Sequence, residues 1–107
     1  MDALFSGLKV IDAASFLAGP CAATILADYG ANVVKVEPLG GDRHRSIAAG
    51  HPADWSWQLT DRNKRGLALD ITAPEGYAVL TDMIAQADVF LVNFSGGQLR
   101  KHNLERS

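Results

Sequence analysis

A strand–helix–strand pattern near the start of the sequence constrains the fold most strongly. Residues 8–13 (Leu-Lys-Val-Ile-Asp-Ala) and residues 32–37 (Asn-Val-Val-Lys-Val-Glu) are rich in apolar and β-branched side chains, which is typical of strands. Between them, Gly19 as N-cap and Pro20 in the first turn indicate the start of a helix, which Gly30 ends. The pattern therefore predicts a β-α-β unit with parallel strands and a right-handed connection.

The same pattern recurs in the second half of the chain. Residues 67–71 and 88–92 predict two further strands. The helix between them is expected to begin with a capping box, in which Thr72 is the N-cap and Glu75 is the third helical residue. Residues 98–101 indicate the start of another helix. This element order is typical of an α/β fold and corresponds to half of a doubly wound domain.

Composition restricts the function classes. Of 107 residues, 48% are hydrophobic and 21% are charged, as in a globular domain. The net charge of -2 argues against binding to nucleic acid or to an anionic membrane through overall charge, and no apolar run approaches the roughly 20 residues that span a bilayer. A single cysteine and the lack of a secretory signal pattern indicate a cytoplasmic location. His44, His51 and His102 show no metal-ligand spacing with Cys21, so no metal is expected.

Ligands of open parallel sheets bind beyond the carboxyl ends of the strands. Four segments should lie on that edge, namely residues 15–19, 37–45, 70–72 and 93–97. Neither G-x-G-x-x-G after the first strand nor G-x-x-x-x-G-K-[ST] occurs, so a standard dinucleotide site and a P-loop are not supported. Backbone amides at Gly19 could hold an anion on this edge, or Gly19 could simply provide a tight turn.

Basic residues form three groups along the sequence. Such groups suit a polyphosphate, because charge-assisted hydrogen bonds to phosphate are strong. A solvated surface is the alternative, since exposed ion pairs contribute little. The groups are Arg43 with Arg45, then Arg62, Lys64 and Arg65, then Arg100 with Lys101. For Asp12, late in the first strand, a role as base or ribose ligand and a structural role both stay open.

Several blocks of the sequence, taken together, closely resemble the N-terminal part of family III CoA-transferases. They occur in the family's order and spacing and cover nearly the whole chain, at residues 8–12, 17–20, 26–38, 40–42, 63–70, 74–76 and 87–94. This family includes formyl-CoA and carnitine CoA-transferases, and α-methylacyl-CoA racemase is a close relative. The resemblance implies a Rossmann-like parallel sheet with flanking helices, in which residues 1–107 form the CoA-binding, N-terminal fragment of a larger domain.

The resemblance also implies which residues contact CoA. Phe16, Leu17 and Ala18 would lie against the CoA nucleotide. Pro38 stands where some members have an adenine-contacting arginine, and Arg43 or Arg45 could compensate for that change. The remaining implied contacts are Asn63, Lys64, Arg65, Arg100 and Lys101 for the phosphates, and Asn93 and Phe94 for the pantetheine arm.

The implied reaction is transfer of CoA between an acyl-CoA and a carboxylic acid through an aspartyl-CoA thioester. Asp12, Asp70 and Asp88 match structural positions of the family, whose nucleophilic aspartate lies beyond the position of Ser107. We therefore expect a truncated chain that supplies the CoA-binding part of a homo-oligomeric enzyme and has no turnover alone. The alternatives are an α-methylacyl-CoA racemase and a truncated, non-catalytic module that binds CoA or a partner.

Overall fold

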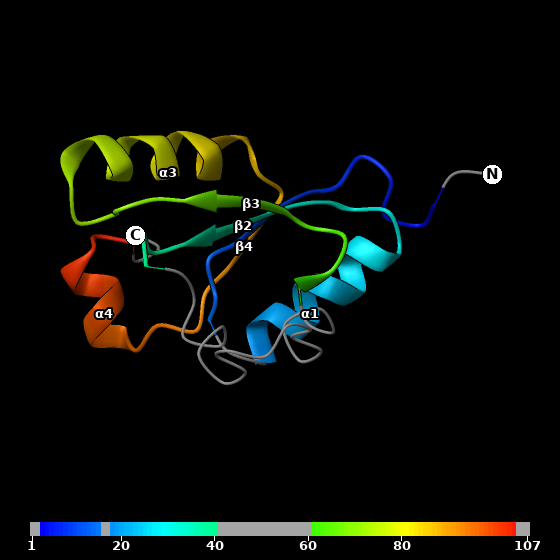
Figure 1. Cartoon of the computed structure of the whole chain (residues 1–107), viewed down its shortest axis with the longest axis horizontal. Helices are drawn as coiled ribbons and strands as arrows, with labels where there is room; N and C mark the ends of the chain where they lie inside the picture. The colour runs from blue at the N-terminus through cyan, green and yellow to red at the C-terminus, as the bar shows by residue number, and fades with distance from the viewer. Residues whose placement is uncertain (1–2, 16–17, 41–60, 105–107) are drawn as a thin grey trace.

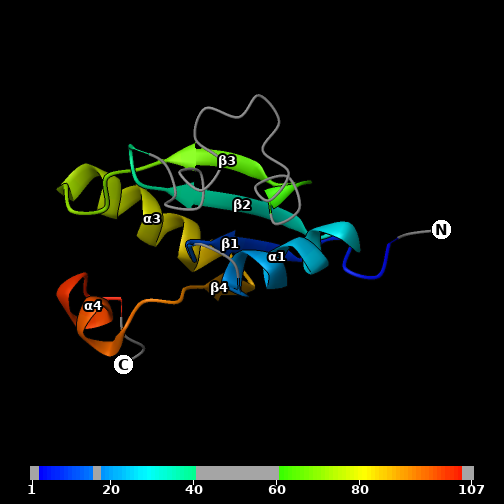
Figure 2. The same ribbon diagram turned by 60° about the horizontal axis from the view of Figure 1, so that its bottom comes forward.

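A parallel β-sheet forms the centre of the molecule in the computed structural model, which describes residues 3–15, 18–40 and 61–104. Its strands within these residues are β1 (Lys9–Asp12), β2 (Asn32–Glu37), β3 (Arg65–Ala68) and β4 (Val89–Leu91). They lie in the order β3-β2-β1-β4, and every neighbouring pair is parallel (Figure 2). The predicted α/β fold with a parallel sheet is therefore confirmed.

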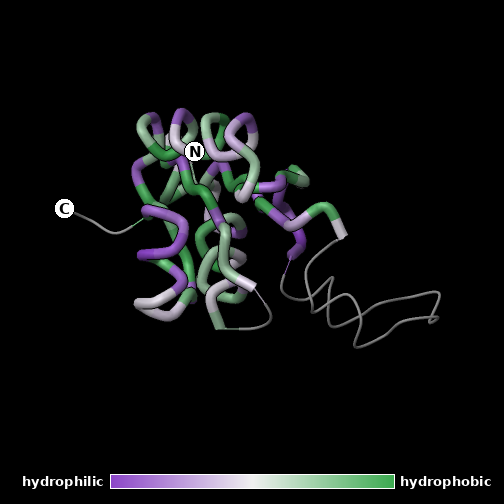
Figure 3. The backbone as a smooth tube through the Cα atoms, turned by 90° about the vertical axis from the view of Figure 1, so that its left-hand side faces the viewer, coloured by the Kyte–Doolittle hydropathy of each residue, from purple (hydrophilic) through white to green (hydrophobic). Residues whose placement is uncertain are grey.

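Helices cover both faces of this sheet. α1 (Ala18–Asp28) lies on one face and α3 (Pro74–Gln86) on the other, while α4 (Gly96–Lys101) lies beyond the carboxyl end of β4 (Figure 1). Because side chains alternate along a strand, β1 and β2 each supply both layers. Val10 and Val33 pack with α1, whereas Ile11 and Val36 pack around Leu80 of α3. The hydrophilic stretch near the C-terminus in Figure 3 is α4, which buries none of its side chains.

Two expectations about helix starts are wrong. α1 begins at Ala18, so Gly19 lies inside the first turn and is not the N-cap. There, a Cβ on Gly19 would lie only 2.3 Å from the Cβ of Ala14, so the glycine lets the helix approach the end of β1.

The capping box expected at Thr72 is also absent. Ala73 is the N-cap of α3 and Pro74 follows it, with no side-chain hydrogen bond to the helix. Thr72 instead donates both its hydroxyl and its backbone N–H to Oδ1 of Asp70, in a local turn that competes with helix capping. A capping box does occur in α4, between Ser95 and Gln98.

Candidate functional site at the carboxyl edge of the sheet

The strand order places a candidate site at the carboxyl ends of β1 and β4. From β1 the chain passes to β2 and β3 on one side of the sheet, and later returns to β4 on the other side. Ligands of open α/β sheets bind at such a reversal, because the adjacent connections leave the sheet in opposite directions. A cavity of about 410 Å³ lies at this edge, lined by Ala13, Ala14, Ser15, Val36, Glu37, Pro38, Leu69, Ile71, Leu80, Asn93, Phe94 and Gln98.

Asn93 joins the ends of the two strands beside the cavity. Its Oδ1 accepts a hydrogen bond from the backbone N–H of Ser15 at 3.1 Å, and its Nδ2 donates to the carbonyl of Ser15 at 2.8 Å. The side-chain amide thus pairs with Ser15 as a peptide group would, one step beyond the Ala13–Leu91 backbone bond. This pairing fixes one wall of the cavity.

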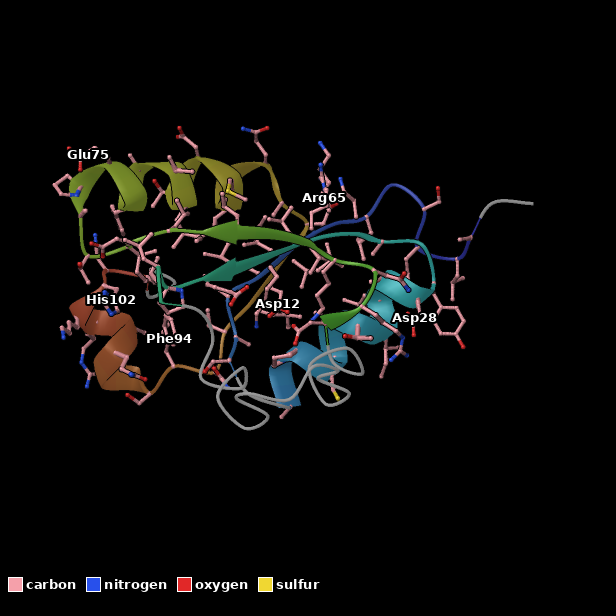
Figure 4. The ribbon with its side chains drawn as sticks, in the orientation of Figure 1. Asp12, Asp28, Arg65, Glu75, Phe94 and His102 are labelled. Atoms are coloured by element: carbon pink, nitrogen blue, oxygen red, sulfur yellow. The ribbon has the colours of Figure 1, made fainter. Side chains whose placement is uncertain are left out.

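The other walls are mostly apolar and come from several elements. The ring of Phe94 is half-buried, and its centroid lies 6.0 Å from that of His102 in α4's C-cap (Figure 4). Pro38, just after β2, also lines the cavity, beside the buried Glu37. Apolar walls with a few polar groups are typical of sites for small organic ligands and cofactors.

A second cavity of about 440 Å³ lies between the start of α3 and the end of α4. It is lined by Ile71, Thr72, Ala73, Pro74, Tyr77, Lys101, His102 and Asn103. Lys101 is exposed there, and Arg100 is exposed in the same last turn of α4. Ile71 lines both cavities, so the two are neighbours along one edge of the sheet.

Lys64 does not line either cavity. Its ammonium is within hydrogen-bond distance of Oδ2 of Asp12 at 2.8 Å, the carbonyl of Pro20 at 2.8 Å and Oδ1 of Asp61 at 3.2 Å. A lysine ammonium has three donors, and these three acceptors can use all of them. The sequence leaves Asp12 open as either a base or ribose ligand or a structural residue. The structure places its carboxylate in this buried ionic cluster.

The residues on either side of Lys64 in the sequence also make contacts away from the two cavities. Arg65 opens β3 at the amino edge of the sheet, donates to Oδ1 of Asn32 at 2.7 Å, and lies far from Phe94 in Figure 4. Asn63 donates to Asp28 at the end of α1, as does Arg62 at 2.6 Å. These hydrogen bonds, that from Arg62 first, lower the pKa of the Asp28 carboxyl below its ordinary value of 3.8.

The site residues expected from the sequence are thus spread over several places. Pro38, Asn93 and Phe94 meet at the first cavity, and Lys101 lies at the second. Ala18 is exposed in the first turn of α1. Phe16, Leu17 and Arg43 lie outside the described residues.

Sequence reasoning did not single out Lys35, which is buried in the middle of β2. The available signal was a lysine within an apolar strand, since a buried charge needs a buried partner. For His102 it considered only metal ligation, which it rejected, and it missed the Phe94–His102 contact because that contact depends on how α4 folds back. Within the described residues, no group of three or more His, Cys, Asp or Glu side chains could hold a metal ion.

The fold and the cavity at the strand reversal define a Rossmann-like α/β protein. Comparison with known families gives the narrower assignment. The sequence model of CoA-transferase family III matches residues 5–107, so the chain belongs to this family.

Similar proteins agree with this assignment. The alpha subunit of succinyl-CoA–L-malate CoA-transferase from Chloroflexus aurantiacus is 40% identical over 103 residues, which is 92% of this chain and 24% of that protein. Succinate–glutarate CoA-transferase from Agrobacterium fabrum is 41% identical over 111 residues, 94% of this chain and 27% of that protein. A crystal structure of a CAIB/BAIF family protein from Brucella suis superposes with a TM-score of 0.90 at 33% identity, covering 99% of this chain and 30% of that one. The chain therefore spans about a quarter of the length of these curated relatives.

None of the helices in the described part of the chain is long and apolar enough to cross a membrane.

Proposed function

We propose that this chain forms the CoA-binding part of an enzyme that transfers coenzyme A between an acyl-CoA and a carboxylic acid. The observation that carries the proposal is the cavity at the carboxyl edge, where β1 and β4 meet. Membership of CoA-transferase family III supports the substrate class, and so do relatives named for transfer between succinate and malate or glutarate.

The residues around the two cavities fit the two chemical halves of CoA. The pantetheine arm is mostly apolar with amide groups, which suits the Phe94 ring and the aliphatic walls of the first cavity. The nucleotide carries phosphates, which suit the exposed cation Lys101 in the lining of the second cavity and the exposed Arg100 that precedes it in α4. The predicted roles of Ala18, Pro38 and the residues outside the described ranges belong to the same proposal.

The proposed chemistry begins with attack of an aspartate carboxylate on the thioester carbon of the acyl-CoA. The C–S bond breaks, CoA leaves as thiolate, and an acyl-aspartyl anhydride forms. The thiolate then attacks the aspartyl carbonyl, which releases the first acid and leaves an aspartyl-CoA thioester; the acceptor acid repeats these two steps in reverse.

We propose that the nucleophile lies outside residues 1–107. Three of the described aspartates already have structural partners. Asp12 bonds to Lys64, Asp70 to Thr72, and Asp88 accepts the backbone N–H of Lys9 at 2.8 Å. The proposed setting is a homo-oligomer in the cytoplasm, and the single cysteine suits a reducing compartment of this kind.

Calorimetric titration with CoA tests the proposal. We expect the wild-type chain to bind CoA and Phe94→Ala to weaken binding by about tenfold, because the ring lines the first cavity. Ile25→Ala is the matched control, since this side chain is 58% exposed on α1 and lines neither cavity.

Absence of CoA binding by the folded wild-type chain, or equal loss in both variants, would contradict the proposal. An assay for transfer of CoA from succinyl-CoA to a carboxylic acid, with the products monitored by chromatography, then distinguishes the transferase from the alternative functions. Transfer by a longer form of the protein supports the transferase, and racemisation of a 2-methylacyl-CoA by that form favours the alternative. CoA binding without either reaction indicates a non-catalytic module.

A further inference from the structure

Four charged side chains form a buried cluster on the α1 face of the sheet. Asp12 and Lys35 are register partners on β1 and β2, and Asp61 and Lys64 reach the same place from the segment before β3. Their side chains are between 0% and 3% exposed. Two lysines and two aspartates balance in charge, as expected for ions removed from water.

This cluster holds the backbone at the end of β1. Oδ1 of Asp12 accepts the N–H of Ala14 at 3.1 Å, and the Lys35 ammonium donates to the carbonyl of the same residue. Both polar groups of the Ala14 backbone are thus bonded to the cluster. Ala14 is itself 1% exposed and lines the first cavity, next to Ser15, which Asn93 holds from the other side.

The cluster also holds the first turn of α1. Lys64 donates to the carbonyl of Pro20, while Gly19 brings the same turn against Ala14. The two lysines therefore bond to main-chain carbonyls on either side of the β1–α1 connection. Neither Lys35 nor Lys64 lines either of the two cavities described above.

We propose that Lys35 and Lys64 are positioning residues for the CoA site, and that they act by fixing the cavity wall at residues 13–15 and the first turn of α1. The inference rests on the proposed function, because it specifies how the same site is held. It assigns to Lys64 a role different from the phosphate contact implied by the family resemblance. A misplaced wall weakens the binding of every ligand that packs against it. Loss of a positioning residue should therefore lower the affinity for CoA and for its phosphate-free fragment, pantetheine, to a similar extent.

The test uses the double variant Lys35→Met/Asp61→Asn. It removes one charge of each sign and keeps the Lys64–Asp12 pair at 2.8 Å, whereas Lys35→Met alone leaves an unbalanced buried carboxylate. Lys9→Met is the matched control, since Lys9 is exposed at the amino end of β1. Circular dichroism establishes that each variant is folded, and titrations with CoA, dephospho-CoA and pantetheine give the affinities.

We expect the double variant to bind all three ligands about tenfold more weakly than the wild type, with Lys9→Met unchanged. A folded double variant with wild-type affinities would overturn the proposal, because the cluster would then serve stability alone. A loss seen with CoA but not with pantetheine would overturn it as well, since that pattern indicates a direct phosphate contact.

Amide hydrogen exchange separates failure of this inference from failure of the proposed function. We expect faster exchange at residues 13–15 in the double variant and unchanged exchange in α3. If the wild-type chain binds none of the ligands, the proposed function fails, yet faster exchange at residues 13–15 still supports the positioning role. Unchanged exchange there overturns the positioning role whatever the titrations give.

Discussion

Gly76→Ala should destabilise the protein, although alanine is the better helix former. Gly76 lies in the first turn of α3, where a Cβ would be 2.0 Å from the Asp70 carbonyl oxygen and 2.8 Å from its carbon. Real Cβ atoms do not approach this closely, and the obstacle is backbone, so α3 or the Asp70–Ala73 turn must move. The helix therefore depends on a glycine at this position.

The two opposing effects differ in size. Gly to Ala inside a helix usually stabilises by about 1 kcal/mol, since glycine loses more conformational entropy on folding. Overpacking a fixed contact costs about 1–3 kcal/mol, and a contact this short is expected at the upper end of that range. We expect a net loss of about 2 kcal/mol, which corresponds to a melting temperature roughly 10 °C lower for a domain of this size.

Thermal denaturation followed by far-UV circular dichroism measures this difference, and Gly97→Ala provides the matched control. A Cβ on Gly97 in α4 would meet nothing nearer than 3.9 Å, so helix propensity alone predicts a stabilisation of up to about 1 kcal/mol there. A Gly76→Ala protein that melts at or above the wild-type temperature would refute the close-approach argument.

Three further predictions concern stability. Gly30→Ala should lower the melting temperature, because φ is +103° and a Cβ would lie 2.4 Å from that of Ala3; denaturation of the variant checks this. Leu80→Ala should cost about 2–5 kcal/mol in urea unfolding, since this side chain is fully buried against Ile11 and Val36, and a loss well below that range would mean the adjacent cavity wall collapses. The hydrogen bond from Arg62 holds the pKa of the Asp28 carboxyl below 3.8 in the folded protein, so the stability that this interaction contributes is present above that pH and is lost as the pH falls through the folded-state pKa. Asp28→Asn should therefore flatten the fall in melting temperature between about pH 5 and about pH 3, and an unchanged slope would contradict this prediction.

The sheet was predictable because its signals are local. Apolar, β-branched segments specify β1 and β2, and Pro20 in the first turn with Gly30 after the last turn locates α1 between them, without reference to the rest of the chain. Asn93 and Phe94 were expected on the carboxyl edge because they directly follow β4. For residues that follow a strand, the strand assignment alone predicts their place in the fold, since parallel strands end at the same edge of the sheet.

Features that depend on distant contacts were not predictable in the same way. Lys64 meets Asp12 across 52 residues, and nothing in its local sequence distinguishes a buried ammonium from a phosphate ligand. Thr72 matches a capping box locally, but Asp70 offers its hydroxyl and amide a nearer acceptor. The helix start around Gly19 depends on how closely α1 approaches Ala14, which is a property of the packed fold.

The pairing of Asn93 with Ser15 bears on the order in which the molecule folds. These residues are 78 positions apart, whereas β1, α1 and β2 form one continuous local unit. Closing a long chain segment is entropically unfavourable, so we expect the local unit to form first and β4 to join last. The cavity wall between β1 and β4 would then be completed only in the final stage, and a ligand of that cavity would select fully folded molecules over partly folded ones.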